Sequence, residues 1–98
     1  MIERQEARLH VIVEGYVQGV GFRAFVQYQA VRLGVVGWVR NRWDGSVEVV
    51  VEGERVILEK LLTVLYRGPH GAQVTGVAPE WSAATGEFKG FSVRMTSG

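Results

Sequence analysis

The sequence predicts an α+β sandwich in which two helices cover one face of an antiparallel sheet. Two observations lead to this prediction. Segments with alternating apolar residues and segments with helical spacing follow one another in the order βαββαβ, and a further short alternating segment closes the chain. The 98 residues, 47% of them hydrophobic, provide enough apolar surface for one core and none for a second. We therefore expect a single domain over residues 1–98.

The charge balance and the missing cysteines exclude several classes of function. The 11 basic and 10 acidic side chains give a net charge of +1, which offers little attraction to nucleic acid or to an anionic membrane. The charged segment Met1–Arg8 lacks the apolar stretch of a secretion signal, and no segment is long enough to span a bilayer. Without cysteine, disulfides and thiol catalysis are excluded. We therefore expect a cytoplasmic monomer with no nucleic-acid or membrane partner.

The first two predicted elements are a strand and a helix. Residues 9–14 alternate between apolar and polar side chains, which is typical of a strand with one buried face. Residues 22–33 then repeat apolar side chains at helical spacing, and Gly34 is suited to end that helix. The segment between them is rich in glycine.

A hairpin is predicted next. Residues 35–41 and 47–52 both show strand-like alternation, and the Asp44-Gly45 pair between them is a strong hairpin-turn signal. We therefore expect the second and third strands to pair with each other.

A second helix is predicted over residues 54–67. Its apolar positions form a leucine-rich stripe at helical spacing. Glu54 is placed in the first turn, where a negative charge is favourable, and the pair Gly68-Pro69 ends the helix.

The remaining elements complete the fold prediction. Residues 74–81 indicate a fourth strand, interrupted at Gly76 and Pro79, and a polar loop over residues 82–90 leads to a short closing strand at residues 91–95. Strand pairs joined by helical crossovers form a split βαβ arrangement. The expected fold is therefore a ferredoxin-like sandwich, βαββαβ with a short extra closing strand, with both helices on one face of an antiparallel sheet.

The segment between the first strand and the first helix has the composition of an anion-binding loop. From Gly15 to Arg23 it reads Gly-Tyr-Val-Gln-Gly-Val-Gly-Phe-Arg, and we call residues 15–21 the glycine loop. Glycine permits a positive φ, so successive backbone N–H groups can converge on an anion, and the first helical turn adds further unpaired N–H groups. Arg23 offers a fork of donors that matches two phosphate oxygens. By itself such a loop is also typical of a tight connection, and such an arginine of a surface charge.

Asn41 is the second candidate site residue. In a split βαβ arrangement the end of the second strand lies near the mouth of the first loop, so we expect Arg23 and Asn41 to face one pocket. A neutral carboxamide can orient a water molecule beside a bound phosphate. Asn41 alone fits equally well as a turn residue, because the Asp44-Gly45 hairpin turn follows it.

Taken together, the two motifs closely resemble the acylphosphatase family. The resemblance rests on the segment Gly15–Arg23, on Gly-Trp-Val-Arg-Asn ending at Asn41, and on Asp-Gly-Ser-Val-Glu starting at Asp44. Length and element order match that family from end to end. The resemblance implies an enzyme that hydrolyses the carboxyl–phosphate bond of small-molecule acyl phosphates to a carboxylate and inorganic phosphate, with no metal or organic cofactor.

The resemblance also implies roles for individual residues. Arg23 binds the phosphoryl group and Asn41 positions the attacking water. The phosphoryl group is also bound by main-chain amides of the glycine loop, namely those of Tyr16, Val17, Gln18, Gly19, Val20 and Gly21. Because neither motif has a His, Asp or Glu placed to accept the proton of that water, we infer that the proton passes to the phosphate of the substrate itself.

Two other classes of function remain open at this stage. The same fold serves as an RNA-binding module, although that function requires exposed aromatic residues on a basic strand and residues 47–52 are acidic and aliphatic. Acylphosphatase-like segments also occur within larger maturation proteins, where such a loop would bind phosphate or carbamoyl phosphate without turnover.

Four further side chains are candidates for a functional role. His10 and His70 have no partners at metal-ligand spacing, so no metal site is predicted. Arg40 and Arg42 flank Asn41 and are candidates either for attracting an anionic acyl group or for solvated surface charges.

Overall fold

A computed structural model of the chain describes residues 5–98. The predicted polar N-terminal segment Met1–Arg8 therefore lies partly outside the described residues, and its last three residues begin the first strand. The elements of the described chain are β1 (Glu6–Tyr16), α1 (Phe22–Leu33), β2 (Val36–Asn41), β3 (Val47–Glu54), α2 (Arg55–Arg67), β4 (Gln73–Ser82) and β5 (Phe91–Val93).

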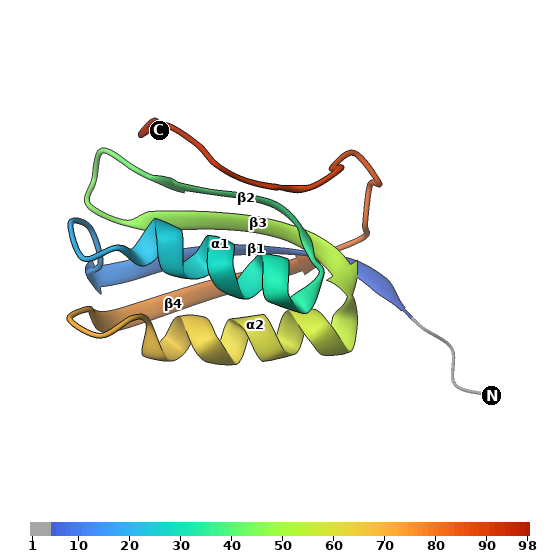
Figure 1. Ribbon diagram of the computed structural model, residues 1–98, viewed down its shortest axis with the longest axis horizontal. Coiled ribbons are helices and arrows are strands. Elements are labelled where there is room, and N and C mark those ends of the chain that lie inside the picture. Colours follow the sequence, from blue (N-terminus) through green and yellow to red (C-terminus); the bar gives the residue numbers. More distant parts are fainter. Residues whose placement is uncertain (1–4) are drawn as a thin grey trace.

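The strands form one sheet in the order β4-β1-β3-β2-β5, and both helices pack on one face of it (Figure 1). The ferredoxin-like α+β prediction is confirmed, as is the pairing of β2 with β3. One feature differs from the prediction. β5 pairs parallel with β2, so the sheet is mixed rather than wholly antiparallel. β4 and β2 run in opposite directions. The chain turns back after β4, so β5 runs in the same direction as β2.

The core lies between the helices and the sheet. In β1, Leu9, Val11 and Val13 have no exposed surface, as the alternation predicts. Leucines of α2 such as Leu58 are equally buried against them. Truncating a buried leucine to alanine typically costs about 2–5 kcal/mol, so this layer fixes how the helices lie on the sheet.

The helix boundaries follow the sequence signals closely. α1 ends at Leu33, and the backbone N–H of Gly34 donates to the carbonyls of Ala30 and Val31, as expected for a glycine that ends a helix. α2 begins one residue later than predicted. Glu54 has extended backbone geometry at the position before the first turn, and its side chain makes no capping hydrogen bond.

The predicted interruption of the fourth strand is wrong. β4 runs without a break through Gly76 and Pro79, which lie opposite Glu14 and Val11 of β1. Proline is tolerated here because β4 is an edge strand with a neighbour on one side only. The irregularity of this strand pair is a bulge at Thr75 of β4, which has no partner because Glu14 lies opposite Gly76 and Gly15 lies opposite Val74.

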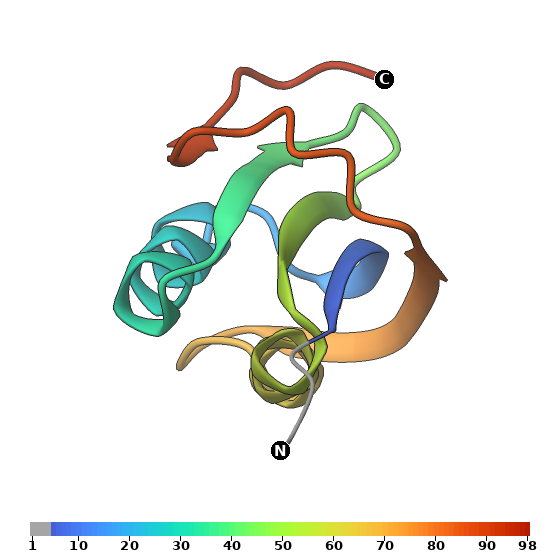
Figure 2. The same cartoon turned by 90° about the vertical axis from the view of Figure 1, so that its right-hand side faces the viewer.

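The segment after β4 crosses the face of the sheet opposite the helices to reach β5 (Figure 2). It is held by Glu52 of β3, which is 3% exposed. The carboxylate accepts hydrogen bonds from the backbone N–H groups of Thr85 and Gly86 and from the Thr85 hydroxyl, at 2.8–3.0 Å. Arg8 adds an ion pair at 3.4 Å. Burial raises the pKa of Glu52, but these hydrogen bonds and the charge of Arg8 outweigh it and lower that pKa below its usual value.

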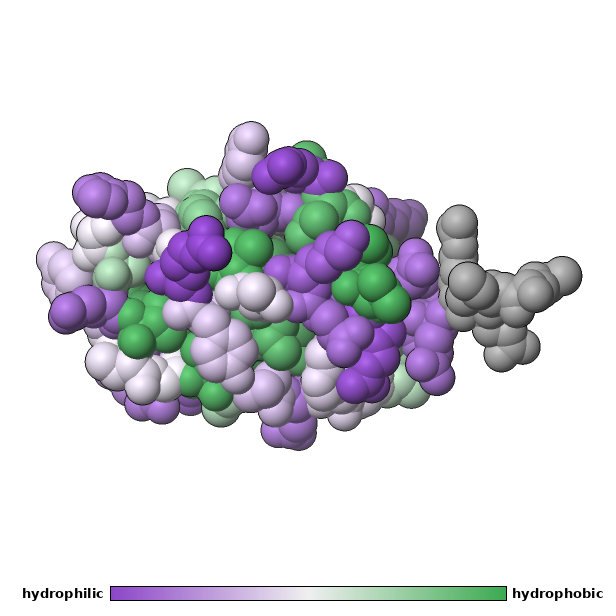
Figure 3. All heavy atoms as spheres, turned by 90° about the horizontal axis from the view of Figure 1, so that it is seen from below, coloured by the Kyte–Doolittle hydropathy of each residue, from purple (hydrophilic) through white to green (hydrophobic). Residues whose placement is uncertain are grey.

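The outer surface of the helices mixes hydrophobic and hydrophilic residues (Figure 3). Exposed apolar side chains on it include Tyr28 and Val31 of α1 and Val56 and Tyr66 of α2. Among residues 5–98, no helix combines the length and the apolar character that crossing a bilayer requires.

Candidate active site

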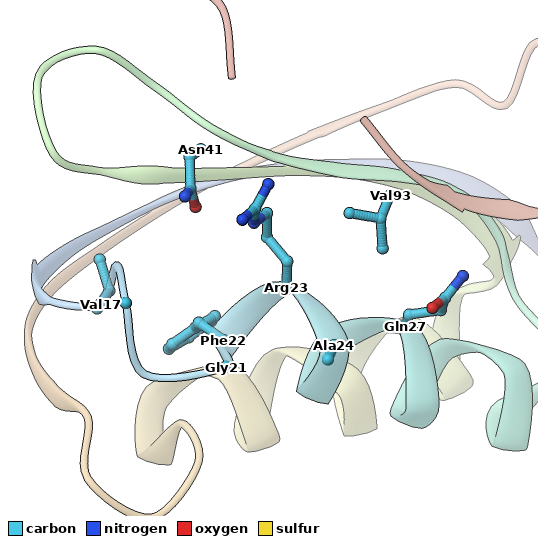
Figure 4. Close-up of a pocket in the computed structure, with 9 residues that line it drawn as sticks. Val17, Gly21, Phe22, Arg23, Ala24, Gln27, Asn41 and Val93 are labelled. Carbon is cyan, nitrogen blue, oxygen red and sulfur yellow. The ribbon is translucent and has the colours of Figure 1, made fainter. Parts of the chain in front are cut away.

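A cavity of about 300 Å³ opens between the start of α1, the glycine loop and the ends of β2 and β5 (Figure 4). Arg23 reaches into it from the first turn of α1, and Asn41 from the end of β2. The two predicted site residues, 18 positions apart in the chain, therefore face a common space. The described residues that line it are Val17, Gly19, Gly21, Phe22, Arg23, Ala24, Gln27, Asn41 and Val93.

The backbone at Gly15 sets the direction in which the glycine loop leaves the sheet. Gly15 follows the point where the β1–β4 register shifts, and it has a φ of 127°. A Cβ at this position would lie 2.1 Å from the carbonyl oxygen of Gln73, so the two backbones approach too closely for any other residue. The requirement for glycine at this position is therefore both conformational and steric.

The glycine loop turns alternate residues toward the cavity. Val17, Gly19 and Gly21 line it, whereas Tyr16, Gln18 and Val20 do not. Val17 is 1% exposed and anchors the loop in the core, while Tyr16 is 63% exposed and lies outside. Of the six residues whose amides are expected to bind phosphate, the structure thus brings three to the cavity wall.

The start of α1 leaves its backbone donors free. Gly21 precedes the helix with a φ of 76° and no side chain caps the first turn, which also contains no acidic residue. The first N–H groups of a helix have no partner within the helix, so those of Phe22, Arg23 and Ala24 are available to a ligand. The positive end of the helix dipole favours an anion at this point.

Arg23 and Asn41 have no competing protein partners. Within residues 5–98, neither the guanidinium of Arg23 nor the carboxamide of Asn41 makes a hydrogen bond or an ion pair. Asn41 is 8% exposed and lies opposite Val47 in the β2–β3 ladder, so it ends a strand and is not a residue of the turn. Both side chains present unused hydrogen-bonding groups to the cavity.

Gln18 has a role that its place in the motif did not indicate. Its side-chain amide donates to the carbonyl oxygens of Arg42 at 2.8 Å and Ser46 at 2.9 Å. These carbonyls belong to the β2–β3 turn, which begins directly after Asn41. Gln18 therefore fixes the glycine loop against the hairpin that carries Asn41.

The turn itself is held by Asp44. Its carboxylate accepts hydrogen bonds from the backbone N–H of Ser46 at 2.9 Å and from the Ser46 hydroxyl at 2.6 Å. These bonds, with the charge of Arg42, lower the pKa of Asp44. The rigid turn keeps the Ser46 carbonyl in place for Gln18.

The arginines beside Asn41 take part in ion pairs. Arg40 pairs with Glu48 at 2.6 Å, and Arg42 pairs with Asp44 at 3.6 Å. Neither arginine lines the cavity. Both side chains are partly buried in these pairs, so neither arginine is a freely solvated charge, and neither is placed to attract an acyl group at this cavity.

Among residues 5–98, no histidine or carboxylate lines the candidate active-site cavity. His10 contacts Glu48 at 2.6 Å, and His70 is exposed in the turn between α2 and β4. Burial raises the pKa of Glu48, but hydrogen bonds from His10 and Arg40 and their charges lower it overall. In the described part of the chain, no three His, Cys, Asp or Glu side chains form a group that could hold a metal ion.

Comparison with known proteins gives a consistent result. The profile of the acylphosphatase family matches residues 9–93. The acylphosphatase of Pelotomaculum thermopropionicum is 53% identical over 87 residues, which cover 89% of this chain and 95% of that protein. The crystal structure of acylphosphatase from Bacillus subtilis superimposes with a TM-score of 0.87 at 36% identity, over 90% of this chain and 98% of that chain.

A larger protein also contains a similar domain. The crystal structure of T. kodakarensis HypF matches 93% of this chain with a TM-score of 0.80 and 31% identity, but the match covers 12% of that chain. The relatives that match over nearly their whole length carry the name acylphosphatase, which favours a hydrolase over a binding module. The chain therefore belongs to the acylphosphatase family, whose activity is the hydrolysis of acyl phosphates.

Proposed function

We propose that the protein carries out this hydrolysis in the 300 Å³ cavity, with the phosphoryl group bound by the glycine loop and Arg23 and the water positioned by Asn41. The observation that carries the proposal is that these three elements line one cavity. A carboxyl–phosphate bond of the substrate is cleaved, and the products are a carboxylate and inorganic phosphate.

Binding of the phosphoryl group is assigned to backbone amides and to Arg23, whose guanidinium has no partner within residues 5–98. The amides of residues 16–21 and of the first turn of α1 supply neutral N–H groups, and Arg23 supplies a planar, permanently charged fork. In phosphoryl transfer, charge spreads over the equatorial oxygens of the transferred group. Donors fixed in advance around those oxygens lower the barrier, because they need no reorganisation during the reaction.

The hydrolytic step needs little further chemistry. The carboxamide of Asn41 accepts from and donates to water, and so directs its lone pair toward phosphorus. The water oxygen bonds to phosphorus while the bond to the acyl oxygen breaks, and the carboxylate departs with the electron pair. The water proton passes to a phosphoryl oxygen of the substrate, in keeping with the lack of any acidic or histidine side chain in the cavity lining.

We include a cytoplasmic location and a monomeric state in this proposal. The absence of cysteine fits a reducing compartment. Size-exclusion chromatography with light scattering should give the mass of one chain, 10.9 kDa, and a mass of twice that value would contradict the monomer.

The test of the proposed function is timed release of phosphate from benzoyl phosphate in chelator-treated buffer. Arg23→Ala should lower kcat/KM by about 10²–10³-fold, the usual loss for a preorganised donor. The same variant should bind inorganic phosphate more weakly in calorimetry. Arg67→Ala, at an exposed arginine in the last turn of α2, serves as the matched control and should retain full activity.

The role of Asn41 has its own signature. Asn41→Ala should lower kcat while phosphate affinity changes little, because the carboxamide contacts the water and not the phosphoryl group. Near-normal turnover of Asn41→Ala would contradict the assigned role.

A further inference from the structure

A second depression of about 480 Å³ continues from the candidate active site along α1. We call it the α1 groove; its lining consists of Ala24, Gln27, Tyr28, Val31 and Arg32. Ala24 and Gln27 also line the active-site cavity, so the two spaces adjoin. The groove therefore offers a path out of the cavity that starts one residue after Arg23.

The spacing of the lining residues explains the shape of the groove. Positions 24, 27, 28, 31 and 32 lie on one side of the helix, and at 1.5 Å per residue they extend about 12 Å along its axis. Helical side chains lean toward the N-terminus of the helix, so Tyr28 and Val31 lean toward the active site. They are 64% and 65% exposed.

The in-line geometry of the reaction places the acyl group on the side of the cavity where this groove begins. In an in-line displacement, the attacking water and the departing acyl oxygen lie on opposite sides of phosphorus. Asn41 extends from β2, whereas Ala24 and Gln27 belong to α1 and form the facing wall of the cavity (Figure 4). A water held at Asn41 places the acyl group toward α1, where the groove begins.

We propose that the α1 groove binds the acyl group of the substrate and makes the enzyme select acyl phosphates with a large apolar acyl group, such as an aromatic one. This inference rests on the proposed function. An aromatic ring in the groove covers the exposed apolar surface of Tyr28 and Val31, which an acetyl group is too short to reach. Acyl phosphates with large apolar acyl groups should therefore bind more tightly than acetyl phosphate.

The groove should act on KM rather than on kcat. Its contacts with the acyl group exist before the reaction and in the transition state alike, and uniform binding of this kind changes KM alone. This separates the groove from Arg23 and Asn41, whose loss should lower kcat because they act on the reacting group.

The experiment compares benzoyl phosphate and acetyl phosphate with the variants Val31→Asn and Tyr28→Ala. Both substitutions keep the net charge, so long-range attraction of the anionic substrate stays the same. Each variant should raise KM for benzoyl phosphate by about fivefold, less than in a closed hydrophobic pocket because the groove is open to water. KM for acetyl phosphate should change by less than about twofold, and kcat should stay unchanged for both substrates.

Matched control variants are available on the other helix. Val56→Asn and Tyr66→Ala alter α2 residues that are 56% and 55% exposed and line neither cavity. They should leave the kinetics of both substrates unchanged. Equal changes in KM for the two substrates, or no change in the groove variants, would overturn the proposal.

Binding of non-hydrolysable analogues distinguishes failure of the groove from failure of the enzyme. Calorimetry would compare phenacylphosphonate with acetonylphosphonate, in which a CH₂ group replaces the bridging oxygen of benzoyl and acetyl phosphate. Tighter binding of the phenacyl compound that is lost in Val31→Asn supports the groove, even if no acyl phosphate were hydrolysed and the proposed function failed. Equal binding of the two phosphonates overturns the groove and leaves the hydrolase intact.

Discussion

At the scale of single residues, the side chain of Gln18 joins the two halves of the candidate active site. Its two hydrogen bonds end on carbonyl oxygens of the turn that follows Asn41. These bonds tie the glycine loop to the hairpin that carries Asn41, the residue proposed to position the water. Small displacements matter here, since a misplacement of about 1 Å can cost about 10²-fold in rate.

Replacing Gln18 should therefore reduce turnover. Gln18→Ala removes two neutral hydrogen bonds, so we expect a loss of about 1–3 kcal/mol in the free energy of unfolding and about a tenfold loss in kcat. Gln18→Glu keeps the shape but replaces the donor with a carboxylate that repels both carbonyls, so its kcat should fall at least as far. Phosphate-release kinetics and urea unfolding measure the two effects. Wild-type turnover in Gln18→Glu would show that the bridge does not position the site, and Gln29→Ala on α1 serves as the control.

The role of Gln18 could not be predicted from the sequence, whereas the roles proposed for the other site residues could. The glycine loop and Arg23 form a continuous motif whose chemistry can be predicted from neighbouring residues. The acceptors of Gln18 lie 24 and 28 residues away and are main-chain carbonyls, which any residue type supplies. No spacing rule indicates such a contact, because it depends on how two loops meet in the folded chain.

At the scale of elements, the close approach of β1 and β4 sets the base of the glycine loop. A Cβ at position 15 would lie 2.1 Å from the Gln73 carbonyl oxygen and 2.8 Å from the Thr75 nitrogen. Both neighbours are backbone atoms, so relief requires the strands to separate where the loop begins.

Gly15→Ala should therefore destabilise the protein and impair the site. The strained φ and the steric overlap together should lower the free energy of unfolding by about 3 kcal/mol or more. Gly76→Ala in β4 is the matched control, because its nearest neighbour would lie 3.9 Å from the new Cβ. Its stability should stay within about 0.5 kcal/mol of wild type. Equal urea midpoints for the two variants would contradict the steric argument.

Local signals predicted most elements because each depends on a short stretch of chain. Gly34 and the Asp44-Gly45 turn depend only on their immediate neighbours. The helix end at Gly34 and the β2–β3 hairpin are both confirmed. Pro79 misled because its effect depends on sheet position, and an edge strand accepts a proline that a central strand would not. The parallel pairing of β5 depends on the path of the chain across the sheet, which no local pattern specifies.

At the scale of the whole molecule, Glu52 holds the segment that crosses the sheet on the face opposite the helices. Its carboxylate holds Thr85 and Gly86, so the segment between β4 and β5 is fixed to β3. The sequence shows an acidic residue in a strand and gives no sign that it is buried. Glu52 is buried because the segment between β4 and β5 covers it, and the path of that segment depends on the order of strands in the whole sheet.

The lowered pKa of Glu52 makes stability depend on acidity. A carboxyl whose pKa is lower in the folded than in the unfolded protein stabilises the fold above the unfolded pKa and loses that contribution as the pH falls through the folded value. Glu48 is shifted in the same direction. The free energy of unfolding should therefore be steady at neutral pH and decline below about pH 4.5.

Glu52→Gln tests this assignment. A glutamine amide directs donors at the backbone N–H groups, so the variant should lose about 1–3 kcal/mol of unfolding free energy at pH 7. Its difference from wild type should shrink as the pH falls, since wild type then loses the same carboxylate. Urea unfolding from pH 7 to pH 3 measures both curves, with Glu80→Gln at an exposed position of β4 as the control. A difference that stays constant over this range would contradict the role of the Glu52 charge.

Because β5 is the last strand of the chain, the cavity is completed late in synthesis. Val93, which lines it, comes from the last strand of the sheet, whereas Arg23 and Asn41 belong to the first half of the chain. During synthesis a ribosome would release the two proposed site residues well before Val93, which completes the wall of their cavity. A nascent chain would therefore carry both of these residues before the cavity that they line is complete.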